Sequence, residues 1–263
     1  MSGRAHDGPP MTLAACAGLV ERGDPDRFAA TLAAPPEARA KLWPIYAFNL
    51  EIARAPWVST QPLIAEMRLQ FWRDVLVAKN PPAHEVAGPL HALIGQTPGL
   101  AALLDQMVEA RRRDIAKEPF ATPSEFDAYI EDTSAILLWA AALALGADPA
   151  AETAFRALGW AAGLANYLRA VPALAARGLT PLYDPDPKAL RILAEEGLNH
   201  LSIARSQRAT CGRAAPAALA AWQAGPLLRQ AYANPTRVAE GTLALSEFIK
   251  RGALAWMGLT GRF

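Results

Sequence analysis

The chain has 263 residues, of which 52% are hydrophobic and 19% are charged. A chain of this length and composition buries a full hydrophobic core without disulfide or metal staples, and the composition excludes an intrinsically disordered protein. The net charge of +1, from 26 basic and 25 acidic residues, excludes the broad basic surface of a dedicated nucleic-acid-binding protein.

Apolar residues recur every three to four positions, Ala and Leu are abundant, and strict alternation is rare, which predicts an all-α fold. In chain order, the predicted helices are Thr12–Arg22, a second beginning at Asp24-Pro25, Pro36–Arg54, Thr60–Ala78, His84–Ile94, Gly99–Lys117, Pro123–Leu145, Ala150–Ala176, Lys188–Thr210, Pro216–Tyr232 and Pro235–Trp256. Pro, Gly, Asn or Asp lies at the boundaries of these segments.

Three details refine this prediction. Ser124 followed by Asp127 resembles a capping box at the start of one helix. The segment from Thr133 to Leu145 is apolar on almost every face, so we expect that helix at the centre of a bundle. Residues 1–10 are predicted to be disordered, and residues 11–263, which contain no linker or repeat, are predicted to form one domain.

The common motifs of metal, nucleotide and hydrolase sites are missing from the sequence. Cys16 and Cys211 lie far apart without CxxC spacing, so neither a thiolate zinc site nor a redox motif is predicted, and a reducing compartment fits. No HExxH, GxGxxG, P-loop or GxSxG pattern occurs. Because no stretch reads as a signal peptide or a membrane span, a cytoplasmic location is expected.

The charged clusters have ordinary interpretations. Asp24 and Asp26 flank a proline, as do Asp184 and Asp186, and both pairs are interpreted as helix caps or turn residues rather than metal ligands. The run Arg111–Arg113 spreads round most of a helix, so at least one guanidinium group is expected to point toward other protein or a partner, although a solvated helical face is the favoured interpretation.

The final segment, ALSEFIKRGALAWMGLTGRF, has two interpretations. It sets apolar side chains against basic ones, as a helix that rests in a membrane interface does. It fits a last bundle helix equally well.

Four stretches, in order, carry a resemblance to a known family: Asp26–Asn49 with Tyr46-Ala47-Phe48, Glu66–Leu76, Tyr129–Gly146 and Gly163–Gly178. The chain resembles the squalene/phytoene synthases, all-α prenyltransferases that join two isoprenoid diphosphates head to head. The resemblance implies a single-domain, isoprenoid-synthase-like helical bundle.

The same resemblance exposes departures at the metal-binding motifs. Where active members carry the aspartates of the first magnesium cluster, this chain has Ala53, Arg54 and Trp57, and Leu50 replaces an arginine. At the second cluster the aspartates are replaced by Ala170 and Leu174 and a glutamine by Gly163, whereas Asn166 and Arg169 persist. A diphosphate leaving group needs Mg²⁺ to stabilise its charge, so the loss argues against ordinary catalysis.

A branch of the family that lacks these aspartates includes mitochondrial assembly factors of respiratory complex I. The leading hypothesis is therefore a protein without catalytic residues, metal or cofactor that acts as an accessory or assembly factor, with respiratory-complex subunits or another protein as partner and peripheral contact with the inner face of the membrane. A degenerate cavity, lined by Tyr46, Arg54, Trp57, Asn166 and Arg169, is expected to hold an isoprenoid or lipid.

Two alternatives stay open. One is an active head-to-head prenyltransferase with an atypical Mg²⁺ site, whose ligands would come from Asp184 and Asp186 or from Glu131 and Asp132. The other is a structural or regulatory protein unconnected with isoprenoids.

Overall fold

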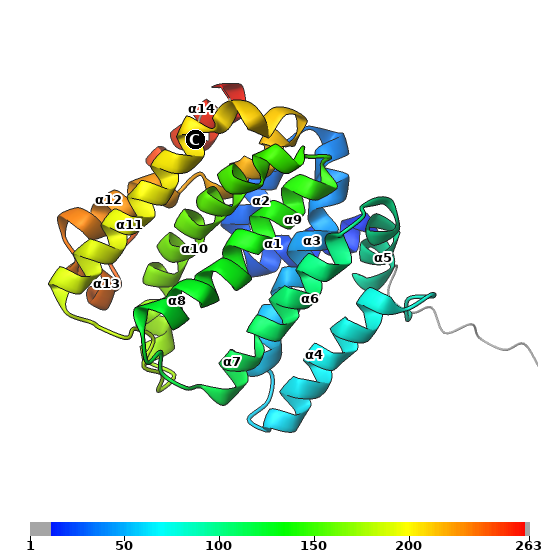
Figure 1. Ribbon diagram of the computed structural model, residues 1–263, viewed down its shortest axis with the longest axis horizontal. Coiled ribbons are helices and arrows are strands. Elements are labelled where there is room, and N and C mark those ends of the chain that lie inside the picture. Colours follow the sequence, from blue (N-terminus) through cyan, green and yellow to red (C-terminus); the bar gives the residue numbers. More distant parts are fainter. Residues whose placement is uncertain (1–11, 261–263) are drawn as a thin grey trace, which may run out of the picture.

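The computed structural model describes residues 12–260, so the prediction of disorder over residues 1–10 lies outside the described residues. Within residues 12–260 the regular elements are all helical and form one bundle, shown in Figure 1. The prediction of an all-α fold is confirmed.

The α-helices are α1 (Leu13–Gly23), α2 (Pro25–Leu32), α3 (Pro36–Arg54), α4 (Pro62–Val77), α5 (Ala87–Gln96), α6 (Leu100–Ala110), α7 (Arg112–Ala116), α8 (Pro123–Ile130), α9 (Ile136–Ala144), α10 (Glu152–Ala175), α11 (Pro187–Ser206), α12 (Ala224–Ala233), α13 (Thr236–Glu240) and α14 (Glu247–Thr260). The other helical segments are the 3₁₀ helices η1 (Ala55–Trp57) and η3 (Pro149–Ala151), the π-helical turn η2 (Glu131–Ala135) and the 3₁₀ segment η4 (Arg208–Ala221), which is interrupted by a kink at Gly212.

The first three helices begin where caps and prolines predict. The Thr12 hydroxyl accepts a hydrogen bond from the backbone N–H of Ala15, and the Asp24 carboxylate accepts one from the N–H of Arg27. Each bond satisfies a donor that the first turn of a helix leaves free. The observed bounds of α3 coincide with the predicted ones.

The centre of the bundle is built from α9 and α10. Eight of the nine residues of α9 are buried, which confirms the prediction of a central helix. Helix α10 packs against α9, α11, α12, η4 and the π-helical turn η2. Gly159 permits the contact with η2, because a Cβ atom there would lie 2.8 Å from both the Ala135 Cα and the Ser134 carbonyl oxygen.

Two predicted helices are wrong in their continuity. The helix predicted over Pro235–Trp256 is two helices, because Gly241 takes a left-handed backbone (φ 69°) that ends α13. The helix predicted over Gly99–Lys117 is broken at Arg111 into α6 and α7. The apolar spacing continues through both breaks, so periodicity alone does not reveal them.

Two further details differ from the prediction. The cap of α8 is Thr122, whose hydroxyl accepts from the N–H of Glu125, rather than Ser124. The start of the predicted helix Pro216–Tyr232 belongs to the 3₁₀ segment η4, and α12 begins only at Ala224.

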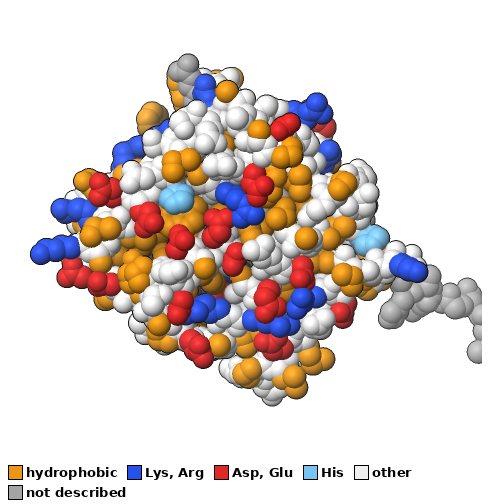
Figure 2. Space-filling model, in the orientation of Figure 1, with side chains coloured by type: hydrophobic (Ala, Val, Ile, Leu, Met, Phe, Trp, Pro, Cys, Tyr) orange, Lys and Arg blue, Asp and Glu red, His pale blue; other side chains and the backbone are white. Residues whose placement is uncertain are grey.

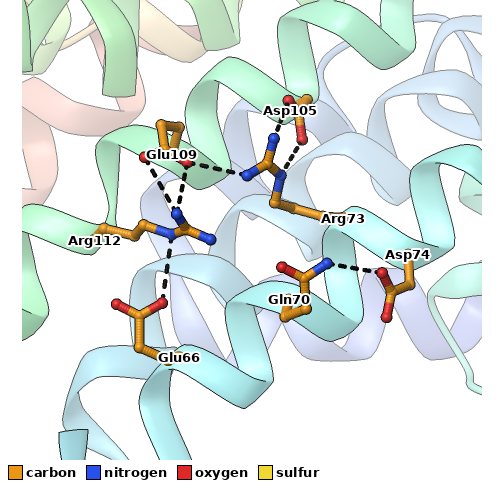
Figure 3. Close-up of polar contacts among 7 residues, drawn as sticks. All are labelled: Glu66, Gln70, Arg73, Asp74, Asp105, Glu109 and Arg112. Carbon is orange, nitrogen blue, oxygen red and sulfur yellow. Dashed lines mark hydrogen bonds and ion pairs between the residues drawn. The ribbon is translucent and has the colours of Figure 1, made fainter. Parts of the chain in front are cut away.

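Helix α4 lies at one edge of the bundle and is tied to α6 and α7 by ion pairs (Figure 3). Arg73 donates to the two carboxylate oxygens of Asp105, at 2.7 and 3.0 Å, and to Glu109 at 3.2 Å. Arg112 pairs with Glu109 and, at 3.4 Å, with Glu66. Because these side chains are partly exposed, the pairs orient the helices more than they stabilise the fold.

Helix α14 lies on the outside of the bundle against η4 (Figure 1). Met257 is buried, whereas Phe248 is 89% exposed, Leu259 87% and Trp256 58%. These three exposed side chains fall on one face at helical spacing, so α14 presents a continuous apolar stripe to the outside.

The surface has one further feature. Figure 2 shows acidic side chains across the middle of the visible face, interspersed with hydrophobic ones. That face does not resemble the basic surface that a phosphate backbone requires.

Among the helices of residues 12–260, none is both long enough and apolar enough to cross a bilayer.

Candidate functional site

Two adjoining cavities lie where the N-terminal part of the chain meets α8 and α10. The first, here named the aromatic cavity, has a volume of about 200 Å³ and lies among η1, α7, α8, α10 and the loop that follows α10. The second, named the polar cavity, has a volume of about 400 Å³ and lies beside the α1–α2 junction. Arg111, Tyr129 and Tyr167 line both cavities, so the two are neighbours.

Aromatic rings form one wall of the aromatic cavity. The Phe120 and Tyr129 rings meet edge to face with centroids 5.4 Å apart, and the Tyr129 and Tyr167 centroids are 6.0 Å apart. The Tyr167 hydroxyl donates to the Pro181 carbonyl at 2.6 Å and so ties α10 to the following loop. Such pairs fix ring positions as well as burying area, so the wall is preformed.

A polar triad separates the two cavities. Arg111 donates to the Asp114 carboxylate at 3.1 Å and to the Tyr129 hydroxyl at 2.8 Å, and that hydroxyl donates to Asp114 at 2.9 Å. Burial raises the pKa of Tyr129 far above its ordinary value, so the phenol stays neutral. Asp114 is therefore fully engaged within the protein.

Trp57 stands at the mouth of the aromatic cavity beside two cations. The Arg177 guanidinium carbon lies 5.1 Å from the centroid of the Trp57 ring, and the Lys117 ammonium nitrogen lies 5.9 Å from it. These distances are those of cation–π contacts. The ring thus lies between two positive charges, one at the end of α7 and one just after α10.

In the polar cavity, Asp26 bridges distant parts of the chain. Its carboxylate accepts from Arg169 on α10 at 2.9 Å and pairs with Lys250 on α14 at 3.3 Å. Partial burial raises the pKa of Asp26, but hydrogen bonds with Gln223, Arg169 and Lys250 outweigh it and hold that pKa below the ordinary value. Asp26 therefore holds α2, α10 and α14 together rather than capping a helix.

The five residues predicted to line a single cavity occupy different places. Trp57 lines the aromatic cavity, and Asn166 and Arg169 line the polar cavity. Tyr46 lies beneath, 1% exposed, with the Arg27 guanidinium 5.0 Å from its ring, and burial raises its pKa to about 12. Arg54 is exposed and lines neither of the two cavities.

Three of the five positions where the resemblance implies aspartates converge in space, whereas Ala53 and Arg54 line neither cavity. Trp57, Ala170 and Leu174 all line the aromatic cavity, although more than a hundred residues separate Trp57 from the other two. Gly163, at the position of the glutamine, faces Ser134, whose Oγ would lie 2.6 Å from a Cβ atom placed there. No larger side chain fits at Gly163 unless α10 moves away from η2.

Other carboxylates are occupied locally. Asp186 caps α11, and Asp184 accepts from the N–H of Asp186, as the cap and turn interpretation predicts. Glu131 pairs with Arg156, and Asp132 accepts from Gln106 at 3.0 Å. Among residues 12–260, no three His, Cys, Asp or Glu side chains gather in a group that could hold a metal ion.

Sequence reasoning missed the basic side of the site. The favoured interpretation of Arg111–Arg113 as a solvated face is wrong, because each arginine pairs with a carboxylate of this chain. The alternative, that at least one guanidinium group points toward other protein, is what the structure shows for Arg111. A run of arginines followed closely by the aromatic residues Phe120 and Tyr129 is the signal in the sequence that could have identified the cavity. The partner of Asp26, 143 residues away, leaves no local signal.

Comparison with known proteins identifies relatives along most of the chain. The family model described as squalene/phytoene synthase matches residues 20–248. Complex I assembly factor 6 of Homo sapiens is 28% identical over 161 residues, which cover 60% of this chain and 48% of that protein. Its Drosophila melanogaster homologue is 31% identical over 202 residues, which cover 73% of this chain and 58% of that protein. The chain thus spans about half the length of the curated relatives it matches.

Solved structures share the fold. A dehydrosqualene synthase solved in complex with a ligand superposes with a TM-score of 0.75 at 15% identity, over 93% of this chain and 94% of that one. Squalene synthase HpnC from Alicyclobacillus acidocaldarius superposes with a TM-score of 0.55 at 19% identity, over 95% of both chains. At these identities the likeness shows an isoprenoid-synthase-like fold alone.

Proposed function

The chain belongs to the squalene/phytoene synthase family, and we propose that it is a non-catalytic member that serves as an accessory or assembly factor for a respiratory complex. Complex I is the expected target, because the curated relatives carry the name of an assembly factor for that complex. The observation that carries the non-catalytic part is the lining of the aromatic cavity, where Trp57, Ala170 and Leu174 stand at three of the five expected aspartate positions.

The residues of this cavity do not fit magnesium. Mg²⁺ prefers several carboxylate and water oxygens in octahedral geometry. Of the two carboxylates that line the cavity, Asp114 is bound to Arg111 and Tyr129, which leaves Glu118 alone. Arg111, Arg113 and Lys117 line the same space and repel a divalent cation. No reaction step through a metal is therefore proposed.

The proposal assigns the cavities a binding role. Together they offer an apolar, aromatic chamber next to a polar one that holds Asn166 and Arg169, an arrangement suited to an isoprenoid or lipid with an anionic head group. The protein partner is a subunit of the respiratory complex.

The proposal also places the protein at the inner face of the membrane. The exposed stripe of Phe248, Trp256 and Leu259 on α14 supports peripheral contact, since such side chains enter the boundary between headgroups and acyl chains. Arg251, also exposed, lies on the flank of that stripe and suits anionic lipids.

Two measurements test the proposal. Purified protein is incubated with farnesyl or geranylgeranyl diphosphate in Mg²⁺ or in EDTA, and we expect no head-to-head product in either. In the organism that carries the chain, we expect deletion of its gene to reduce assembled complex I on native gels. Mg²⁺-dependent product refutes the non-catalytic role and favours the prenyltransferase. Unchanged complex I refutes the assembly role.

A further inference from the structure

We infer that the outer side of α4 is the interface of a symmetric dimer, in which two copies of this chain pack groove against groove. The inference goes beyond the proposed function and does not depend on it, because self-association is measured whether or not the protein assists a respiratory complex. Three observations carry it: a second apolar face on α4, an aromatic groove beside that face, and two opposite charges in the groove that lack an ion-pair partner.

Helix α4 has two apolar faces. Its inner face buries Ala65, Leu69 and Trp72 against the bundle. On its outer face Leu63 is 70% exposed and Met67, one turn later, is 63% exposed. Figure 2 shows hydrophobic side chains at the lower edge of the molecule, where Figure 1 places the start of α4. A helix at the edge of a bundle needs only one apolar face, so the outer face is expected to be covered by other protein.

A groove of about 400 Å³ runs beside this outer face, between α4, the C-terminal part of α3 and the loop that leads from α4 to α5. Its floor is aromatic. The Phe71 and Trp72 rings meet edge to face with centroids 5.2 Å apart, and the His84 ring also lies 5.2 Å from that of Trp72. Such contacts fix the rings, so the floor is preformed. Aromatic residues, methionine and arginine, which line this groove, are enriched at protein interfaces.

The groove contains one negative and one positive charge. Glu51 of α3 and Arg68 of α4 both line it. Neither takes part in an ion pair with another residue among 12–260. Because the two side chains share a groove and do not pair with each other, each is free to meet a charge from another molecule.

A second copy of the chain is the occupant that these charges match. In a dimer with two-fold symmetry every contact occurs twice, with the two residues exchanged between the copies. A groove with one acid and one base therefore complements itself, because Glu51 of each copy faces Arg68 of the other. A strongly acidic or strongly basic partner would leave one of the two charges opposed by a like charge.

The outer face and the groove complement each other in shape as well. Leu63 and Met67 project from the outer face, and in the dimer they enter the groove of the other copy. Met67 adapts to such a contact, because its side chain is unbranched and flexible. Burial of the apolar side chains supplies the attraction, whereas the charges set the orientation and the choice of partner.

The test is sedimentation velocity of the full chain between about 1 and 100 μM. We expect a species with twice the 28.1 kDa mass of the chain to increase with concentration. Arg68→Glu is expected to weaken the dimer by at least about tenfold, because it sets two pairs of like charges opposite each other. The double variant Glu51→Arg, Arg68→Glu restores both attractive pairs and is expected to return the dissociation constant to within about threefold of the wild type.

Matched variants on α11, which Figure 1 places at the other edge of the bundle, show whether these effects are local. Arg191→Glu makes the same change of net charge as Arg68→Glu at an exposed residue and is expected to leave the dimer intact. Met67→Asp is expected to abolish the dimer, whereas Ile192→Asp, at a side chain that is 66% exposed, is not. All four side chains are exposed, so we expect circular dichroism to show the wild-type fold in each variant.

Three outcomes overturn the inference: a chain that stays monomeric at about 100 μM, a double variant that associates no better than Arg68→Glu, or a dimer that survives Met67→Asp. Loss of the dimer in the double variant Phe248→Ser, Trp256→Ser also overturns it, because the interface would then lie on α14. None of these results bears on the proposed function, which is tested by product formation and by the amount of assembled complex I.

Discussion

The close approach of α10 to the π-helical turn η2 is tested by placing one methyl group at Gly159. A Cβ atom there meets the Ala135 Cα and the Ser134 oxygen at 2.8 Å, and both are backbone atoms that cannot swing aside. Overpacking of this kind costs up to about 3 kcal/mol. Alanine regains about 1 kcal/mol of helix propensity over glycine. Gly159→Ala is therefore expected to lower the free energy of unfolding by about 2 kcal/mol.

The matched control is Gly252→Ala in α14, where a Cβ atom meets nothing within 4 Å. There the propensity gain acts alone, so we expect the free energy of unfolding to rise by about 0.4–1 kcal/mol. Thermal unfolding followed by circular dichroism measures both. For a chain of this size, Gly159→Ala corresponds to a melting temperature lower by roughly 5 °C. A Gly159→Ala protein as stable as the wild type would show that α10 and η2 are not in backbone contact.

Replacing Arg111 by methionine leaves Asp114 and the Tyr129 hydroxyl buried without their cation. We therefore expect the free energy of unfolding, measured by urea titration, to fall by about 3 kcal/mol. A loss below about 1 kcal/mol would contradict the buried triad. Because the pKa of Asp26 is lowered, its ion pairs stabilise the fold above about pH 4 and lose that effect as the pH falls through the lowered pKa. The difference in free energy of unfolding between wild type and Asp26→Asn should therefore shrink below about pH 4. A difference that stays constant with pH would refute the pairing. The double variant Phe248→Ser, Trp256→Ser should reduce co-sedimentation with anionic vesicles, whereas Ile192→Ser, which alters an exposed apolar side chain on α11, should not. Equal effects would contradict membrane contact through α14.

Local signals account for the parts of the fold that were predicted from sequence. Asp24 and Pro25 mark the start of α2 because cap and proline act within one turn. The all-apolar segment ending at Leu145 identified the central helix because it offers no polar face to water. The break at Gly241 escaped prediction because apolar residues continue on both sides of it, so the segment was interpreted as one helix, whereas the glycine has a left-handed backbone that ends α13.

The candidate site was predicted less completely for a physical reason. Trp57 was singled out because a resemblance placed it at a motif, and the structure does bring it beside Ala170 and Leu174. Arg111 was misjudged because one of its partners, the Tyr129 hydroxyl, lies on another helix, 18 residues further along the chain. Long-range pairs such as Asp26 with Arg169 depend on tertiary packing, which no local window of sequence contains.

The π-helical turn Glu131–Ala135 has an evolutionary and a mechanical consequence. A π turn is equivalent to one extra residue inserted into an α-helix, and each residue advances a helix by about 100°. The wider π turn takes up that residue over nearly the same total rotation, so α8 and α9 stay in phase as they would in a regular helix. Deleting one residue from the turn would therefore leave Tyr129 at the cavities and the buried face of α9 in the core. What the deletion would change is the local bulge, which presents Ser134 and Ala135 to Gly159 and Gly163 of α10. The turn thus absorbs an insertion locally, and the two glycines of α10 are the complementary change on the facing helix.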